Sequence, residues 1–299
     1  MRKILSLLAI TIFCTSVALA NDDARAQEIL KQARQAIGGD EQLQKIQGLQ
    51  INGQYRRMLG DRQMGGDREI SISLPNKYLV EDAMNAGGLS TAMINFRGLN
   101  GDKAWSGNSG GGGGMVFRIG GPGGQASPEQ MEEMLRRIYT AEFSRYLLAI
   151  ILTPPLAVEY KYAGESDVED VQADVVDVSG PNNFAARVFF DKKSHMPLLL
   201  SYRGPKPRIM TMTRQAGSGS KPEDVAKARA EAEKKMQAET PATPEEVDFY
   251  IRMTDYKKVG SVTLPYKLTF LTENEVSEEF EISKYQLNPQ FKADRFEKH

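Results

Sequence analysis

The chain has 299 residues and is close to electrically neutral, with 38 lysines and arginines against 39 aspartates and glutamates. Binding to DNA or RNA through the phosphate backbone needs a basic excess, so this balance argues against a nucleic-acid partner. The two histidines and one cysteine leave little material for a metal site or a catalytic triad. We therefore expect no bound metal and no cofactor.

The first twenty residues (1–20) have the pattern of a cleavable secretory signal peptide. A positively charged start precedes an apolar stretch over 4–13 and a small-x-small motif that ends at Ala20. This pattern predicts cleavage after Ala20 and a location in the periplasm. The only cysteine, Cys14, lies within the leader. Lipidation of Cys14 is disfavoured, because Phe13 stands where a lipoprotein signal needs a small residue.

Removal of this leader, with its two basic residues, would leave 279 of the 299 residues and 36 basic against 39 acidic residues. That length is sufficient for one large β domain, and we expect a single domain over 21–299. The mature chain would contain no thiol, so it could form neither a disulfide nor a thiolate metal site. We expect it to be a monomer.

Two segments have the periodicity of helices. Over 23–37 the apolar residues recur at intervals of three and four, and two glycines follow, which predicts an amphipathic helix that packs on another element. The sequence Ser127-Pro128-Glu129-Gln130 has the residues of a helix start. It predicts helix over 128–152, either continuous or broken near Thr140. The methionine-rich stripe of this helix is typical of core, although methionine also lines adaptable apolar sites.

The remaining regular segments have a period of two, which is typical of strands with one buried face. His195 falls in a tight connection between two of them, and we interpret it as a turn residue rather than a ligand or base. Strands are predicted over 49–56, 69–74, 78–80, 92–96, 171–178, 185–190, 198–202, 249–256, 261–264, 266–272 and 278–285.

Two segments interrupt this pattern. Residues 106–125 are rich in glycine, which indicates a flexible loop; a phosphate-binding loop is disfavoured because no Gly-Lys-Ser/Thr follows. Residues 203–247 form an insertion that contains a highly charged helix at 222–238. Its apolar stripe is thin, so we expect a solvated arm, which could dock a protein partner in the cell envelope.

An antiparallel sheet with this many strands has to curve. We therefore predict an α+β fold that is mainly β, an open half-barrel of antiparallel strands. The helices predicted at 23–37 and 128–152 would cover its concave face and leave an apolar groove between helix and sheet.

Several segments, taken in order, resemble the bacterial outer-membrane lipoprotein-sorting family (LolA/LolB-like). Together they cover most of 23–296, apart from 106–125 and 203–247. The resemblance implies a half-barrel with a helical lid over a hydrophobic cavity that binds acyl chains. The segments are 46–53, Leu74-Pro75-Asn76-Lys77-Tyr78, Asn100-Gly101-Asp102-Lys103-Ala104-Trp105, 188–197, 259–265 and 281–291.

One departure from the family limits what the resemblance implies. The lipoprotein carriers have an arginine just before the strand proline, and it latches the lid. Leu74 occupies that position here, so the latch cannot be transferred. The resemblance therefore implies a lipid-binding fold and leaves lipoprotein transfer itself open.

The leading hypothesis is thus a periplasmic protein that binds a lipid or an acylated protein. The same apolar positions could equally be ordinary core. The predicted cavity and lid residues are Ile72, Tyr78, Val80, Trp105, Met131, Met134, Ile138, Leu147, Phe189, Leu198 and Leu200.

Two other hypotheses come from different classes. One is a structural or interaction module of the envelope with an unoccupied groove. The other is an enzyme, suggested by the carboxylates clustered over 165–174, which could in principle supply an acid–base pair. The sequence offers no nucleophile–base pair, so we predict no catalytic residue.

Overall fold

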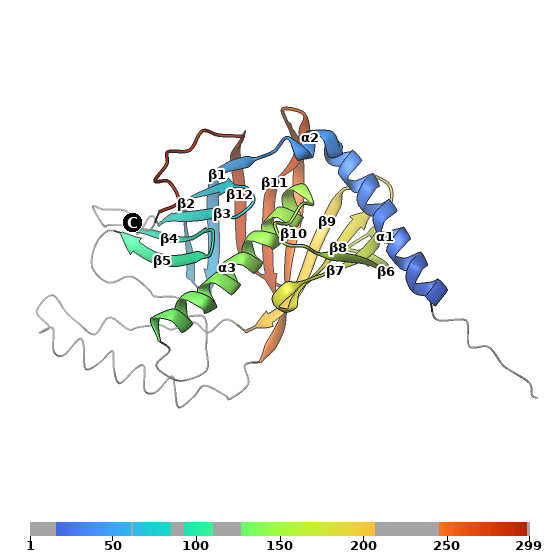
Figure 1. Cartoon of the computed structure of the whole chain (residues 1–299), viewed down its shortest axis with the longest axis horizontal. Helices are drawn as coiled ribbons and strands as arrows, with labels where there is room; N and C mark the ends of the chain where they lie inside the picture. The colour runs from blue at the N-terminus through green and yellow to red at the C-terminus, as the bar shows by residue number, and fades with distance from the viewer. Residues whose placement is uncertain (1–15, 61, 85–92, 110–126, 207–244, 298–299) are drawn as a thin grey trace, which may run out of the picture.

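The computed structural model describes residues 16–60, 62–84, 93–109, 127–206 and 245–297. Within these residues the chain forms one antiparallel sheet of twelve strands, crossed by a long helix (Figure 1). The predicted fold class, an open and mainly β half-barrel, is confirmed. The strands are β1 (Gly48–Leu59), β2 (Arg62–Ser73), β3 (Lys77–Met84), β4 (Met93–Asn100), β5 (Lys103–Ser109), β6 (Glu159–Val168), β7 (Val171–Gly180), β8 (Phe184–Asp191), β9 (Pro197–Pro205), β10 (Glu246–Val259), β11 (Val262–Thr272) and β12 (Glu275–Leu287).

The helices are α1 (Ser16–Ile37), the short α2 (Asp40–Gln44) and α3 (Pro128–Ile151), with a 3-10 turn at Pro181–Asn183. The strand order is β5-β4-β3-β2-β1-β12-β11-β10-β9-β8-β7-β6. Every strand therefore pairs with its neighbour in sequence except at β5–β6, where α3 carries the chain from one edge of the sheet to the other. Strands β1 to β5 form one meander and β6 to β12 form another, and pairing of β12 with β1 joins the two.

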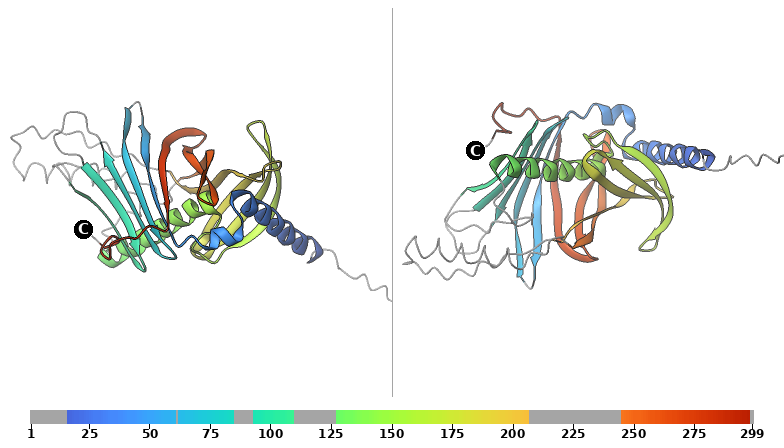
Figure 2. Two further views of the ribbon diagram at one scale, coloured as in Figure 1. Left: turned by 90° about the horizontal axis from the view of Figure 1, so that it is seen from above. Right: turned by 60° about the horizontal axis from the view of Figure 1, so that its bottom comes forward.

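Helix α3 can make this crossing because the sheet is curved. Twelve flat strands at about 4.8 Å spacing would extend over about 53 Å. The 24 residues of α3 rise by only about 36 Å. Curvature brings the two edge strands within reach of one helix, and Figure 2 shows α3 crossing the strands on one side of the sheet.

The start of α3 follows the predicted capping pattern. The Ser127 hydroxyl accepts a hydrogen bond from the backbone of Gln130, whose side chain accepts one from the backbone of Ser127. The helix is continuous to Ile151, so the first of the two alternatives, an unbroken helix, is the one found. It ends at Leu152, which adopts a left-handed conformation before two prolines.

Helix α1 confirms the helix predicted over 23–37. Its apolar side, formed by Ala26, Ile29, Leu30, Ala33 and Ile37, is at most 2 % exposed and lies mainly against β6. In the uncleaved chain the helix begins at Ser16, so it includes the end of the predicted leader; residues 1–15 lie outside the described part.

Two strands that were predicted separately form one continuous strand in the structure. Residues predicted separately as 261–264 and 266–272 form β11, which contains Pro265. The proline is tolerated because the ladder between β11 and β12 begins only at Lys267. The hydroxyl of Tyr285 donates to the Pro265 carbonyl at 2.6 Å.

The long insertion leaves and rejoins the sheet at neighbouring points. Pro205 at the end of β9 faces Glu246 at the start of β10, and the Lys206 amide donates to the Glu245 carbonyl. The predicted helix at 222–238 and residues 110–125 of the glycine-rich loop lie outside the described residues. His195 is a turn residue, as predicted, with a positive φ and an amide that donates to the Asp191 carbonyl.

Candidate functional site

The concave face of the sheet, beneath α3, contains the main apolar core. Five of the predicted cavity residues are fully buried in this core cluster. Helix α3 contributes Phe143, whose ring stacks on Tyr78 at 5.1 Å between centroids. Helix and sheet are thus in direct contact along this face. The five residues are Ile72, Tyr78, Val80, Leu147 and Leu200.

The other predicted residues are spread over the fold. Met131, Met134 and Ile138 lie in the first half of α3 and are half-buried, as is Leu198 on β9. Trp105 pairs with Gly98 of β4. Leu99, the next residue of β4, belongs to the core cluster, so Trp105 points to the other, outer face of the sheet. Phe189 alternates with Val188 and Phe190 of the core cluster and also points outward. The structure therefore brings only part of the predicted set together beneath α3.

A network of ion pairs lies on the same concave face, beside the apolar core. Three of its members, Arg68, Asp82 and Glu278, are buried. Arg68 donates to both oxygens of Asp82, at 2.6 and 3.0 Å, and to both oxygens of Glu278, at 2.5 and 3.3 Å. The network consists of Arg57, Arg68, Arg97, Asp82, Glu142 and Glu278.

The charges in this network hold each other in the ionised state. Burial by itself would raise the pKa of Asp82, but the positive charges of Arg68 and Arg97 outweigh burial and lower it to about 2. The pKa of Glu278 is also lowered, because Arg68 and Arg57 outweigh the effect of its burial. The guanidinium of Arg68 lies over the Tyr55 ring, 4.6 Å from its centroid. Each guanidinium nitrogen of Arg68 thus has a carboxylate partner.

The network connects the sheet to α3 through Glu142. Arg97 on β4 donates to the Glu142 carboxylate from Nε at 2.9 Å and from Nη2 at 2.8 Å, and the Tyr78 hydroxyl donates to it at 2.8 Å. The Arg97 and Glu142 side chains are 23 % and 25 % exposed. This polar contact therefore lies where solvent reaches the edge of the interface between α3 and the sheet.

The sequence contains a signal for this network that the hydrophobic pattern alone does not show. Arg68 precedes Ile70 and Ile72 at the core-facing parity of β2, and Asp82 follows Val80 in the same way on β3. A charged residue at such a position must find a partner or leave the core. The partners come from separate strands, so only the sheet register identifies them.

Three of the five carboxylates clustered over 165–174 pair with cations. Asp174 is buried and lies 3.5 Å from Arg25. Glu165 accepts a hydrogen bond from Lys192 at 2.6 Å, and Glu169 lies 2.9 Å from Arg252. The described residues include no group of three or more His, Cys, Asp or Glu side chains that could hold a metal ion.

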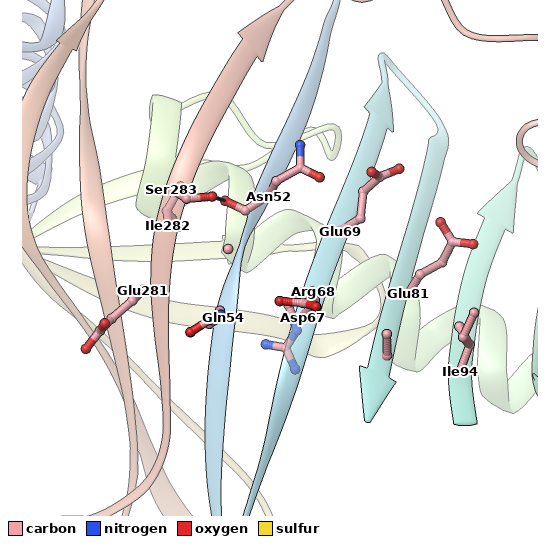
Figure 3. Close-up of a pocket in the computed structure, with 12 residues that line it drawn as sticks. Asn52, Gln54, Asp67, Arg68, Glu69, Glu81, Ile94, Glu281, Ile282 and Ser283 are labelled. Carbon is pink, nitrogen blue, oxygen red and sulfur yellow. Dashed lines mark hydrogen bonds between the residues drawn. The ribbon is translucent and has the colours of Figure 1, made fainter. Parts of the chain in front are cut away.

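A pocket of about 640 Å³ with four carboxylates in its lining lies on the side of the sheet away from α3 (Figure 3). Its charged and polar lining comes from outward positions of β1, β2, β3 and β12, including Asn52, Asp67, Glu69, Glu81 and Glu281. Such a lining is unsuited to an acyl chain, and none of the predicted cavity residues contributes to it.

The chain is similar to several solved structures. One is a LolA superfamily protein, NE2245, from Nitrosomonas europaea, with 10 % identity over 91 % of this chain and 97 % of that one, at a TM-score of 0.47. A second is an outer membrane lipoprotein-sorting protein domain from Vibrio parahaemolyticus, with 8 % identity over 92 % and 97 % and a TM-score of 0.45. A third is a DUF1329 family protein from Desulfovibrio piger, with 9 % identity over 91 % and 97 % and a TM-score of 0.40.

No protein-family model and no curated protein matches the chain. The identities to these structures are 10 % or lower and the TM-scores are below 0.5, so the matches assign neither a family nor a function to the chain. No described helix is both long enough and apolar enough to cross a bilayer.

Proposed function

We propose that this protein is exported to the periplasm and carries a lipid or an acylated protein, with the acyl chain held between α3 and the concave face of the sheet. The observation that carries the proposal is the position of α3. Helix α3 lies across the concave face of the open sheet and packs on its apolar side chains. Its removal would expose a large apolar surface that matches the chemistry of an acyl chain.

In the described state this interior is filled by side chains, since Tyr78, Leu147 and Leu200 are inaccessible to solvent. Ligand entry therefore requires α3 to move, and the helix acts as a lid. Each methylene transferred from water contributes about 0.8 kcal/mol, so a chain of about 16 carbons would gain roughly 12 kcal/mol before association costs. Association itself costs at least about 4 kcal/mol, which leaves at most about 8 kcal/mol towards displacement of the lid.

The polar contacts of the lid suit reversible opening. Glu142 is a quarter exposed, and partly exposed ion pairs contribute only about 1 kcal/mol each. The stronger, fully buried contacts of Arg68 remain within the sheet and need not break. The lid could therefore open while the sheet keeps its structure.

Native mass spectrometry tests this proposal directly. The full chain, with its own leader, would be expressed, purified from the periplasm without detergent, and analysed before and after solvent extraction. We expect a mature chain that begins at Asn21 and a bound lipid at about one per protein.

The purified protein would then be mixed with an acylated peptide, with the same peptide lacking the acyl group as a matched control. Binding of the acylated peptide alone would support the proposal. A clean apo mass that neither phospholipid nor acylated peptide changes would refute it and favour an envelope interaction module without a ligand.

A further inference from the structure

Arg145 on α3 is a half-buried cation that has no anionic partner among the described residues. Its guanidinium lies 3.8 Å from the centroid of the Tyr202 ring on β9 and 5.5 Å from that of Phe184. Nε is shielded from solvent and has no hydrogen-bond partner among the described residues. Within the same part of the chain, no carboxylate lies within ion-pair distance of Arg145. The nearby Glu142 is occupied by Arg97 and Tyr78.

The environment of Arg145 differs from that of the other buried arginines. Burial lowers the pKa of the Arg145 guanidinium. Burial acts in the same direction on Arg68, but there the charges of Glu278 and Asp82 outweigh it and raise the pKa. Arg145 has aromatic faces in place of carboxylates, which compensate only part of its lost hydration. Nε is shielded from solvent, whereas the residue as a whole is half-buried.

Arg145 also ends an apolar stripe on α3. Met131, Met134, Ile138, Ala141 and Arg145 follow each other at alternating intervals of three and four residues, so they share one face of the helix. All five are half-buried. The stripe rises by about 21 Å along the helix. Ile138 and Ala141 also pack against the core cluster, so the stripe lies along the margin of the contact between α3 and the core. At its end is a positive charge that no described carboxylate pairs with.

We propose that this face of α3 binds a lipid with an anionic headgroup. The acyl chain lies along the stripe, and a headgroup phosphate oxygen accepts hydrogen bonds from Arg145. The inference rests on the proposed lipid-carrying function and specifies the class of lipid. A phosphate would supply the missing countercharge, and charge-assisted hydrogen bonds to a guanidinium are among the stronger polar contacts. Arginine, unlike lysine, can give two such bonds while stacked on Tyr202.

The test is lipid extraction from vesicles. The full chain, delipidated after purification, would be incubated with vesicles of phosphatidylcholine and phosphatidylglycerol in equal amounts and recovered by gel filtration, and its lipids would be quantified. We expect wild type to take up phosphatidylglycerol about tenfold more than phosphatidylcholine. Arg145→Gln should bring the ratio close to one, and Arg145→Lys should keep part of the preference.

Arg137→Gln is the matched control, because it removes the same charge from an exposed position of α3. It should leave the ratio unchanged. Circular dichroism and urea unfolding of each variant would show that it is folded.

The other outcomes separate the two proposals. Extraction of neither lipid by wild type would refute the carrier function and this inference with it. Uptake of both lipids without preference, or a preference that persists in Arg145→Gln, would overturn the anionic site and leave the carrier function standing. Stabilisation by inorganic phosphate alone, dependent on Arg145 and without a lipid preference, would assign the site to a free anion and overturn the headgroup.

Discussion

Replacement of Arg68 by methionine should destabilise the protein far more than the same replacement of a surface arginine. The side chain of Arg68 is 1 % exposed, and those of its partners Asp82 and Glu278 are 4 % and 10 % exposed. Methionine has a similar reach but no charge, so it would leave two carboxylates buried without their main cation. Removal of one partner from a buried ion pair costs about 3–5 kcal/mol.

The pKa of Asp82 provides an independent scale for this loss. A shift from the ordinary 3.8 to about 2 corresponds to about 2 kcal/mol of stabilisation from this carboxylate alone. Glu278 adds a shift in the same direction. Arg97 and Arg57 remain at the edge of the network in the variant, which places the expected loss near 3 kcal/mol rather than 5.

Arg56→Met is the matched control. Arg56 lies on the side of the sheet away from α3, and its side chain is 47 % exposed. Like Arg68 it pairs with two carboxylates, Glu279 and Glu281. Its replacement should cost less than about 1 kcal/mol, because exposed pairs are screened by solvent. Urea unfolding followed by the fluorescence of Trp105, the single tryptophan and a buried one, would measure both variants.

The pH dependence gives the decisive comparison. The folded pKa of Asp82 in wild type is below its unfolded value, so its contribution is complete above about pH 4 and is lost as the pH falls towards 2. Without Arg68 the folded pKa of the buried carboxylates rises. The penalty of Arg68→Met should therefore shrink as the pH is lowered from 7 to 4. Equal penalties for Arg68→Met and Arg56→Met, or a penalty that does not change with pH, would refute this account of the network.

Three further changes test the lid and the sheet. Ser127→Ala removes the cap of α3 and should cost about 1 kcal/mol, measured as a lower melting temperature; no change would mean that the helix start does not depend on the cap. Gly53→Ala places a methyl group against the backbone carbonyl of Glu281 and should cost about 1–3 kcal/mol in urea unfolding, whereas a neutral result would show that the β1–β12 ladder can shift. Glu142→Gln weakens the contact with Arg97 and should speed amide hydrogen exchange in α3 several-fold while global stability falls by about 1 kcal/mol. An unchanged rate of amide hydrogen exchange in α3 would show that the Glu142 contacts do not hold the helix on the sheet.

Local chemistry in the sequence was sufficient to predict most elements of the fold. The cap at Ser127 and the stripe over 128–152 predict α3 almost to the residue, and the glycines after Ile37 predict the end of α1. Period-two alternation predicts most of the strands. It fails at Pro265, because a proline inside a strand is acceptable only where the neighbouring ladder is incomplete, and the sequence of β11 does not show where β12 begins to pair.

The candidate site was predictable only in part, because alternation shows that two sets of residues face opposite ways and not which face α3 covers. Trp105 and Phe189 were therefore grouped with Tyr78, although they lie on the other face.

By itself, the sequence determined most of the helical and strand segments and the antiparallel curved sheet, since these follow from local periodicity and turn chemistry. Only the tertiary structure decided which charges meet. Arg68 and Glu278 are 210 residues apart, and Arg145 reaches Tyr202 only because α3 crosses to β9. Whether a charged side chain has a partner of opposite charge depends on contacts between distant segments, and the local sequence does not predict these contacts.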